Sequence, residues 1–251
     1  MSQSLPLVGN VALVTGASGD IGSATCRRLA AAGAQVVVNY RSSVDKAQAV
    51  LDDLPGQGHS LVHAAVDSPT DVQRMADFVA ERYGRLDVLV NNAGFTRFVE
   101  HADLDALDDG LIDDIFRTNW RGAFACIRAL RALLQAHDGG VVINVSSIAG
   151  RTGQGSNVAY CASKAALDSM TRSLGRALAP QIRVVSVSPG LVDGPYAASF
   201  DRDFIAEQAR RTPLGRLVTA EDVAATIYAV IAHMPMLTGT DVHVDGGRPL
   251  S

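Results

Sequence analysis

Cysteine is scarce in this chain of 251 residues, and its three cysteines, Cys26, Cys126 and Cys161, stand far apart. An odd number of scattered cysteines does not form a disulfide framework, and it favours a reducing cytoplasm as the location. Long apolar runs are also missing, because no stretch approaches the ~18 residues that identify a membrane-spanning helix. The start, Met1 to Pro6, has neither a basic nor an apolar region, so we expect no secretory signal.

Positive charge is in deficit, because 22 lysines and arginines are outnumbered by 26 aspartates and glutamates, which leaves a formal net charge of -4. Nucleic-acid-binding domains carry a surplus of basic residues instead, so no nucleic acid is expected as a partner. The histidines never take a spacing typical of metal ligands, and no metal site is predicted. Their positions are 59, 63, 101, 137, 233 and 243.

Short apolar runs alternate with helical patterns along most of the chain, and 47% of the residues are hydrophobic, enough for a sizeable core. Buried strands are predicted at 10–15, 35–39, 60–66, 86–90, 141–145, 182–187 and 241–244. Helices are predicted at 21–32, 44–54, 70–83, 104–135, 157–179 and 220–233. The alternation predicts one α/β domain over 1–251, a doubly wound (Rossmann) sheet of about seven parallel strands with helices on both faces.

Tyr160 and Lys164 are four residues apart in a predicted helix, so their side chains lie on one face, one turn apart. A free tyrosine has a pKa of about 10. An ammonium ~4 Å away at an effective dielectric constant of ~20 contributes ~4 kcal/mol, enough to lower that pKa by up to roughly three units. The pair would make Tyr160 a general acid or base near neutral pH. A tyrosine and a lysine at this spacing arise often by chance, so the neighbouring motifs decide whether the pair is interpreted as catalytic.

Five short motifs supply that context. They are Thr15 to Gly22, Asn91 to Gly94, Asn119, Ser147 with Tyr160 and Lys164, and Pro189-Gly190. In this order they resemble the short-chain dehydrogenase/reductase family over nearly the whole chain. The resemblance implies that Tyr160 donates a proton to a ketone oxygen, that Ser147 hydrogen-bonds this oxygen, and that Lys164 holds the nicotinamide ribose. It also implies that Asn119 bends its helix and holds a water that relays protons to Lys164.

A glycine-rich turn follows the first predicted strand, where backbone N–H groups and a helix start can receive a pyrophosphate. The residues expected to bind the cofactor there are Gly16, Ser18, Gly19, Asp20, Ile21 and Gly22. The family more often has glycine at the position of Asp20. Asp20 either starts the helix and benefits from its dipole, which we favour, or repels phosphate slightly.

The end of the second predicted strand indicates which nicotinamide cofactor is used. NAD-dependent relatives usually carry an acidic residue there, which accepts hydrogen bonds from ribose hydroxyls. This chain instead has Asn39, Tyr40, Arg41 and Ser42. A guanidinium with nearby hydroxyls could hold a 2′-phosphate by charge-assisted hydrogen bonds, although Arg41 could also be a solvated loop cation. We therefore expect NADP(H) as the cofactor.

Other segments join the predicted site by resemblance alone. The adenine is expected beside Asp67 and Ser68, the adenosine side beside Asn91, Ala93 and Gly94, and the nicotinamide beside Pro189, Gly190 and Val192. Gly194 stands where the family often has a threonine that bonds the carboxamide. The polar segment 193–218 is the expected substrate lid. Its aromatic residues indicate a largely apolar substrate wall, though they could equally pack on one another.

These features predict an NADPH-dependent oxidoreductase that reduces a ketone or 3-oxo compound to a secondary alcohol. One alternative is a 3-oxoacyl-carrier-protein reductase, which Asn91 to Arg97 and Thr238 to Gly247 resemble. Acidic carrier proteins call for basic docking residues, which are missing just before the fifth strand and just after the Tyr160 helix, so a free small ketone or alcohol is favoured. A non-catalytic NADP-binding regulator is a remote alternative. Apolar residues on several sides of helices 104–135 and 157–179 favour a homotetramer.

Overall fold

The computed structural model describes residues 6–250 and contains a seven-stranded sheet with the strand order β3-β2-β1-β4-β5-β6-β7. Every neighbouring pair is parallel. The strands are Val11–Val14 (β1), Gln35–Tyr40 (β2), Ser60–His63 (β3), Val88–Asn91 (β4), Gly140–Val145 (β5), Ile182–Pro189 (β6) and Thr240–Val244 (β7). The chain moves outward from β1 to β3 and then returns to place β4 on the other side of β1. This confirms the predicted doubly wound sheet.

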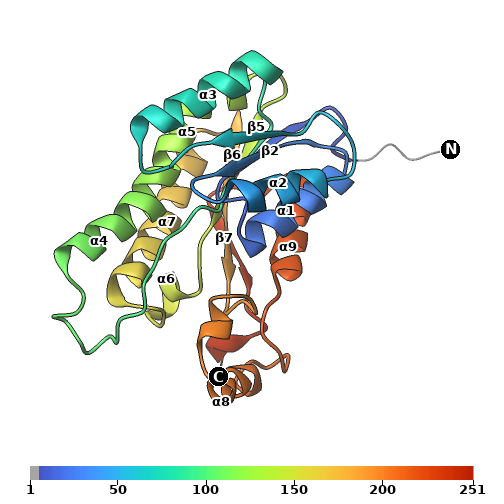
Figure 1. Cartoon of the computed structure of the whole chain (residues 1–251). Helices are drawn as coiled ribbons and strands as arrows, with labels where there is room; N and C mark the ends of the chain where they lie inside the picture. Colours follow the sequence, from blue (N-terminus) through green and yellow to red (C-terminus); the bar gives the residue numbers. More distant parts are fainter. Residues whose placement is uncertain (1–5, 251) are drawn as a thin grey trace.

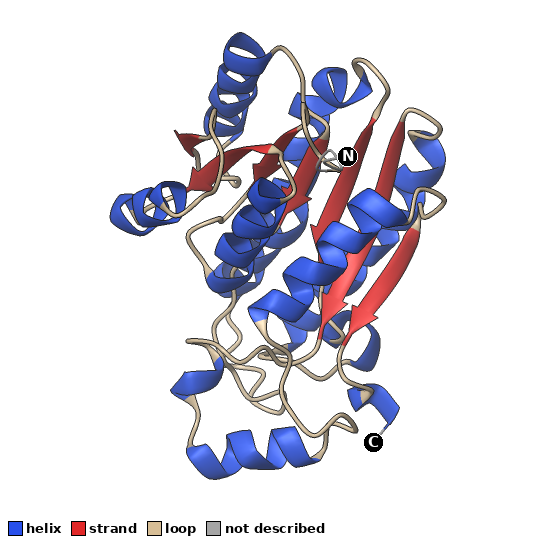
Figure 2. Cartoon of the chain, turned by 90° about the vertical axis from the view of Figure 1, so that its right-hand side faces the viewer, coloured by secondary structure: helices blue, strands red, loops and turns tan. Residues whose placement is uncertain are grey.

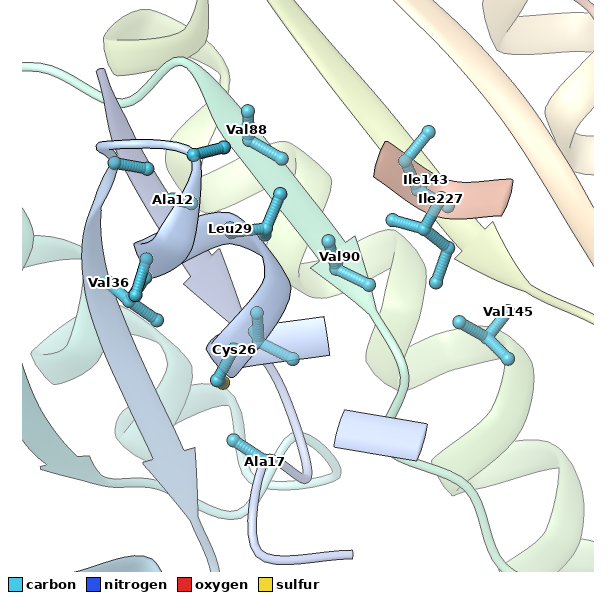
Figure 3. Close-up of a cluster of buried hydrophobic side chains, with 14 of the residues drawn as sticks. Ala12, Ala17, Cys26, Leu29, Val36, Val88, Val90, Ile143, Val145 and Ile227 are labelled. Carbon is cyan, nitrogen blue, oxygen red and sulfur yellow. The ribbon is translucent and has the colours of Figure 1, made fainter. Parts of the chain in front are cut away.

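Helices cover both faces of the sheet (Figure 1). One face packs against α1 (Asp20–Ala31), α2 (Val44–Asp52) and α9 (Ala220–His233), and the other packs against α3 (Pro69–Tyr83), α5 (Ala123–Gln135) and α7 (Val158–Ala177). Side chains alternate between the faces along each strand. Val36 and Val38 of β2 therefore belong to one apolar cluster and Val37 to the other. Figure 3 shows the first cluster, in which Leu29 and Cys26 of α1 lie over the valines of the strands.

The helix predicted for 104–135 is three segments and begins later than expected. Asp108 accepts a hydrogen bond from the Leu111 N–H at 2.8 Å and so caps α4 (Asp109–Phe116). A π-helical turn, Arg117–Gly122, follows, and α5 completes the stretch. The side chain of Asp108 thus determines where the helix starts, and the π-helical turn interrupts its regular hydrogen bonding.

The segment 193–218, predicted only as polar, contains a short 3-10 turn at Ala197–Ser199 and helix α8 (Arg202–Arg210). Asp201 caps α8 by accepting a hydrogen bond from the Phe204 N–H at 2.7 Å. Figure 2 shows α8 apart from the sheet, beyond the loops at one end of the strands. A further single turn, α6 (Ala149–Thr152), lies in the loop between β5 and α7.

Within residues 6–250, no helix is long and apolar enough to cross a membrane, and no group of three or more His, Cys, Asp or Glu side chains could hold a metal ion. The three cysteines are buried free thiols. The prediction about a secretory signal rests mainly on residues 1–5, which lie outside the described part of the chain.

Candidate active site

A cleft of about 520 Å³ opens at the carboxyl ends of the central strands, where ligands bind in open α/β sheets. It extends from Arg41 and Asp67, past the N-terminus of α1, to Tyr160 and Gly190. The predicted site residues that line it are Gly16, Ser18, Gly19, Asp20, Ile21, Gly22, Asn39, Arg41, Ser42, Asp67, Ala93, Gly94, Ser147, Tyr160, Lys164, Pro189, Gly190 and Val192. An elongated cleft with a glycine turn and a helix N-terminus fits a dinucleotide.

The glycine turn depends on close backbone approach. Gly16 has φ +61°, and a Cβ there would lie 2.9 Å from the Cα of Ala93. A Cβ on Gly22 would lie 2.6 Å from the Gly16 carbonyl oxygen. Asn92 holds the turn, because its Nδ2 donates to the carbonyl oxygens of Thr15 at 2.9 Å and Gly16 at 3.1 Å. The turn is therefore fixed by hydrogen bonds to the end of β4.

Asp20 is the first residue of α1, exposed at the cleft, which agrees with its interpretation as a helix-start residue. Its carboxylate also reaches toward the start of segment 193–218. A Cβ at Gly194 would overlap the Asp20 Oδ2 atom. The two positions at which the sequence departs from the family pattern therefore meet in space.

The end of β2 presents one buried amide and one exposed cation. Asn39 accepts a hydrogen bond from the Gly16 N–H and donates to the carbonyl oxygens of Val62 and Ala64. Its side chain is thus occupied in bracing the glycine turn against β3. The Arg41 side chain is exposed and lines the cleft beside Ser42.

Four predicted site residues do not line the cleft. Tyr40 packs against the apolar core, with its ring 5.4 Å from that of His63. Ser68 caps α3 by accepting from the Asp71 N–H at 3.3 Å. Asn91 is buried and donates to Asn144 Oδ1 at 2.9 Å. Asn119, the fourth, is described next.

Asn119 lies in the π-helical turn, where an irregularity was predicted. Its Oδ1 accepts from the Phe95 N–H at 2.7 Å, and its Nδ2 donates to the Phe95 carbonyl oxygen and to Ser163 Oγ, each at 3.1 Å. Asn119 thereby connects the loop after β4 to helix α7. Its predicted water relay to Lys164 stays a prediction.

The predicted catalytic side chains meet where β5 ends and α7 begins. Ser147 follows β5, Tyr160 lies in the first turn of α7, and Lys164 lies one turn later. Asn157 caps α7 by accepting from the Tyr160 N–H at 2.7 Å. The sequence reasoning missed Asn157, although an asparagine directly before a helix is an N-cap signal.

The pKa values of Tyr160 and Lys164 correct one prediction. Burial raises the pKa of Tyr160 to about 12, although a hydrogen bond with Ser147 lowers it. Burial also lowers the pKa of Lys164 to about 8, while the charge of Asp168 raises it. The Lys164 Nζ lies 5.7 Å from the centre of the Tyr160 ring and donates to the Val145 carbonyl oxygen at 2.8 Å. The prediction of a depressed Tyr160 pKa is therefore wrong, because desolvation outweighs the hydrogen bond with Ser147.

A second cavity, of about 580 Å³, adjoins the cleft and shares Ser147, Tyr160 and Tyr196 with it. Phe200 lies at the centre of its aromatic wall. The ring centre of Phe200 is 4.9 Å from that of Phe204, 5.4 Å from that of Tyr196 and 5.8 Å from that of Phe98. Tyr196, Phe200 and Phe204 thus line this cavity and also contact one another, and their role as a substrate wall stays a prediction.

Other cleft-lining residues were not among the predicted site residues. They are Ala64, Val66, Asn92, Phe95, Thr96, Thr118, Val145, Ser146, Gly194 and Tyr196. Asn92 belongs to the motif Asn91 to Gly94 and could have been found from it, and Gly194 was noted above for its position in the family pattern. The others follow strand ends or lie in neighbouring segments, where the spacing of residues in the sequence does not identify them.

Comparison with known proteins gives a consistent result. The family model described as enoyl-(acyl carrier protein) reductase matches residues 16–248. A Streptomyces violaceoruber protein named as ketoacyl reductase 2 of the granaticin polyketide synthase is 40% identical over 242 residues, 96% of this chain and 96% of its own. The Staphylococcus aureus 3-oxoacyl-[acyl-carrier-protein] reductase FabG is 34% identical, covering 94% of this chain and 96% of its own. A solved short-chain dehydrogenase/reductase structure from Burkholderia xenovorans has a TM-score of 0.89 at 34% identity, covering 96% of this chain and 98% of that one.

Proposed function

We propose, on the premise that this chain belongs to the short-chain dehydrogenase/reductase family, that Ser147, Tyr160 and Lys164 carry out the reduction of a small-molecule ketone or 3-oxo compound. The protein is an oxidoreductase that uses a nicotinamide cofactor and acts on a C=O/CH–OH pair. One observation carries the proposal: Ser147 and Tyr160 line both the dinucleotide cleft and the adjoining cavity. A carbonyl group in the cavity would therefore lie beside both hydroxyls.

The chain's own residues would donate the proton and orient the substrate, and the nicotinamide supplies hydride when bound. A Tyr160 pKa of about 12 keeps the phenol protonated at neutral pH, as a proton donor to the carbonyl oxygen requires. Ser147 hydrogen-bonds to Tyr160 and would orient the same oxygen. Lys164 would hold the ribose hydroxyls of the cofactor.

For the cofactor we propose NADP(H). The support comes from the end of β2, where no carboxylate stands and where the Asn39 side chain is already engaged by three backbone groups. The exposed Arg41 and Ser42 are then the polar side chains at this end of the cleft that suit a 2′-phosphate. Asp67 lines the cleft nearby, where the adenine is proposed to lie.

For the substrate we propose a free small ketone or simple ester, and the alternative is a 3-oxoacyl group on a carrier protein. Carrier proteins are acidic, so an acidic face disfavours docking. Acidic residues before and within α4 are exposed, namely Asp103, Asp105, Asp108, Asp109, Asp113 and Asp114. Arg128 and Arg131 on α5 are also exposed and temper this argument. The names of the two relatives, a ketoacyl reductase and a 3-oxoacyl-[acyl-carrier-protein] reductase, keep the carrier-bound alternative open.

The test is turnover by the purified full chain. We expect NADPH oxidation with a panel of ketones and 3-oxo esters, and a higher kcat/KM with NADPH than with NADH. One 3-oxoacyl group is then offered both on carrier protein and as a simple ester. A carrier preference above about 100-fold, some 2.7 kcal/mol, would reverse the choice of substrate. Cofactor binding without turnover of any ketone would instead favour the non-catalytic regulator.

We further propose a cytoplasmic homotetramer. Buried free thiols suit a reducing compartment. Trp120, just before α5, and Phe124, within α5, are half-buried and stack with ring centres 6.0 Å apart. Val158 at the start of α7 is 45% exposed. Apolar side chains that stay partly exposed suit a subunit interface. Light scattering that gives a single monomeric species at micromolar concentration would reject the assembly.

A further inference from the structure

A row of polar side chains crosses the otherwise apolar sheet on the face that α7 covers. Asn91 of β4 pairs in register with Asn144 of β5, Asn144 with Ser186 of β6, and Ser186 with Asp241 of β7. Residues paired in register point to the same face of a sheet, so these four form one continuous row. Two residues earlier on the same strands, the corresponding row is Leu89, Val142 and Val184.

Helix α7 contributes two further polar side chains to this row. Thr171 Oγ1 accepts from Asn144 Nδ2 at 2.8 Å and from Ser186 Oγ at 2.9 Å. Asp168 lies one turn nearer to Lys164 and is only 7% exposed, with the hydroxyls of Ser146 and Ser186 beside it. Its Oδ1 is buried and has no hydrogen-bond partner among the described residues. A buried carboxyl oxygen without a partner costs free energy, so its retention calls for a reason.

Lys164 supplies the reason. It is 5% exposed, and its Nζ donates to the Val145 carbonyl oxygen, a neutral acceptor. A buried ammonium loses its hydration, and a nearby negative charge compensates for part of that loss. Asp168 follows Lys164 by one helical turn and lies on the same side of α7.

We propose that Asp168 is a positioning residue that keeps Lys164 charged and in place, acting through the electrostatic field of its carboxylate. The proposal rests on the proposed function for what Lys164 does, but not for the effect of Asp168 on Lys164. It gives the polar row a role, because the hydroxyls beside Asp168 help to keep its carboxylate ionised within an apolar core.

Several titratable groups determine the pKa values of Asp168 and Lys164. Burial raises the pKa of Asp168, as does the charge of Asp241 on β7, whereas the Ser146 and Ser186 hydroxyls and Lys164 lower it. Asp241 in turn bonds to Ser188 Oγ at 2.6 Å and to His243 at 2.8 Å. The Tyr160 ring also lies near Lys164, with its centre 5.7 Å from Nζ, and its phenol is neutral at neutral pH. Since the charge of Asp168 raises the pKa of Lys164, removing that charge makes Lys164 lose its proton at lower pH.

The titration of Lys164 can be measured directly, because Lys164 and Lys46 are the only lysines in the sequence. In full-length protein labelled with ¹³C at lysine Cε, two signals titrate, and exposed Lys46 on α2 serves as the internal reference. Asp168→Asn should lower the titration midpoint of Lys164 by at least about half a pH unit and leave Lys46 unmoved. An unchanged Lys164 midpoint in this variant would overturn the proposal.

Thr171→Val is the matched control, because it breaks two hydrogen bonds of the same row without changing any charge. An equal Lys164 shift in this variant would show that packing, not charge, is responsible. Should Asp168→Asn fail to fold, Asp168→Ser takes its place, because it also removes the charge and leaves a smaller polar side chain. The same downward shift of the Lys164 midpoint is expected, and no shift rejects the proposal. The titration needs neither cofactor nor substrate, so a failure of the proposed function would leave its result interpretable.

Discussion

The two halves of the active site are built in different ways. On the cofactor side, the amides of buried Asn39 and partly buried Asn92 tie the glycine turn to neighbouring strands through several hydrogen bonds to backbone groups. On the substrate side, Phe98, Tyr196 and Phe204 are between 39% and 48% exposed, and their wall consists mainly of ring contacts. The difference leads us to expect that the cofactor position depends on the sheet, whereas substrate choice depends on side chains that could change without disturbing the sheet.

Tyr160 lines both the cleft and the adjoining cavity, so a variant at this position tests the point where the two meet. It should have the largest effect on turnover. We expect Tyr160→Phe to lose at least ~100-fold in kcat, the scale of general acid catalysis, while the dissociation constant for NADPH stays unchanged. Steady-state rates and cofactor titration measure the two quantities. Tyr196→Phe is the control, since it removes a second hydroxyl that lines both cavities. Comparable losses in the two variants would contradict the assignment of Tyr160.

Arg41→Ala should affect only the cofactor half. Losing a charge-assisted hydrogen bond of ~1.5–3 kcal/mol should raise the KM for NADPH about 10- to 100-fold. The KM for NADH should hardly change, because that cofactor carries no 2′-phosphate. Lys46→Ala, which removes another exposed cation a few residues away, serves as the control. If NADPH and NADH weaken equally, Arg41 has a structural role and the NADP(H) proposal loses its main support.

Phe200→Ala should affect only the substrate half and have the smallest effect. Removing the central ring of the wall should raise the KM for bulky apolar ketones up to about 10-fold, with little change for small ketones. The dissociation constant for NADPH should stay constant. Leu214→Ala provides a control, because Leu214 is 75% exposed in the same segment but does not line the cavity. A change in NADPH affinity in Phe200→Ala would show that the halves are not separable.

The features that the sequence predicted well are local or repeat along the chain. Buried strands follow from short apolar runs, as the fully buried Val11–Val14 illustrates. A helix irregularity follows from an amide at Asn119 within an amphipathic stretch. The partner of that amide, Phe95, lies 24 residues away, and nothing in the local sequence identifies it.

The features that it missed depend on atoms brought together by the fold. Desolvation of Tyr160 comes from the surrounding protein. A prediction that considered only the charge of Lys164, one helical turn away, therefore gave the Tyr160 pKa shift the wrong sign. Tyr40 lies at the end of its strand, as expected, but its side chain packs against the core. Ser68 directly precedes a helix, and its side chain caps that helix. Helix α8 was not predicted, because a mostly polar segment carries little apolar periodicity.

The contact between Asp20 and Gly194 has an evolutionary consequence. The Asp20 carboxylate occupies the space that any side chain at position 194 would enter. A chain of this lineage that acquired a threonine at position 194 would have to turn the exposed Asp20 side chain away from that position. The two positions are therefore coupled, and a designer who wants a hydroxyl at position 194 has to choose residue 20 together with it.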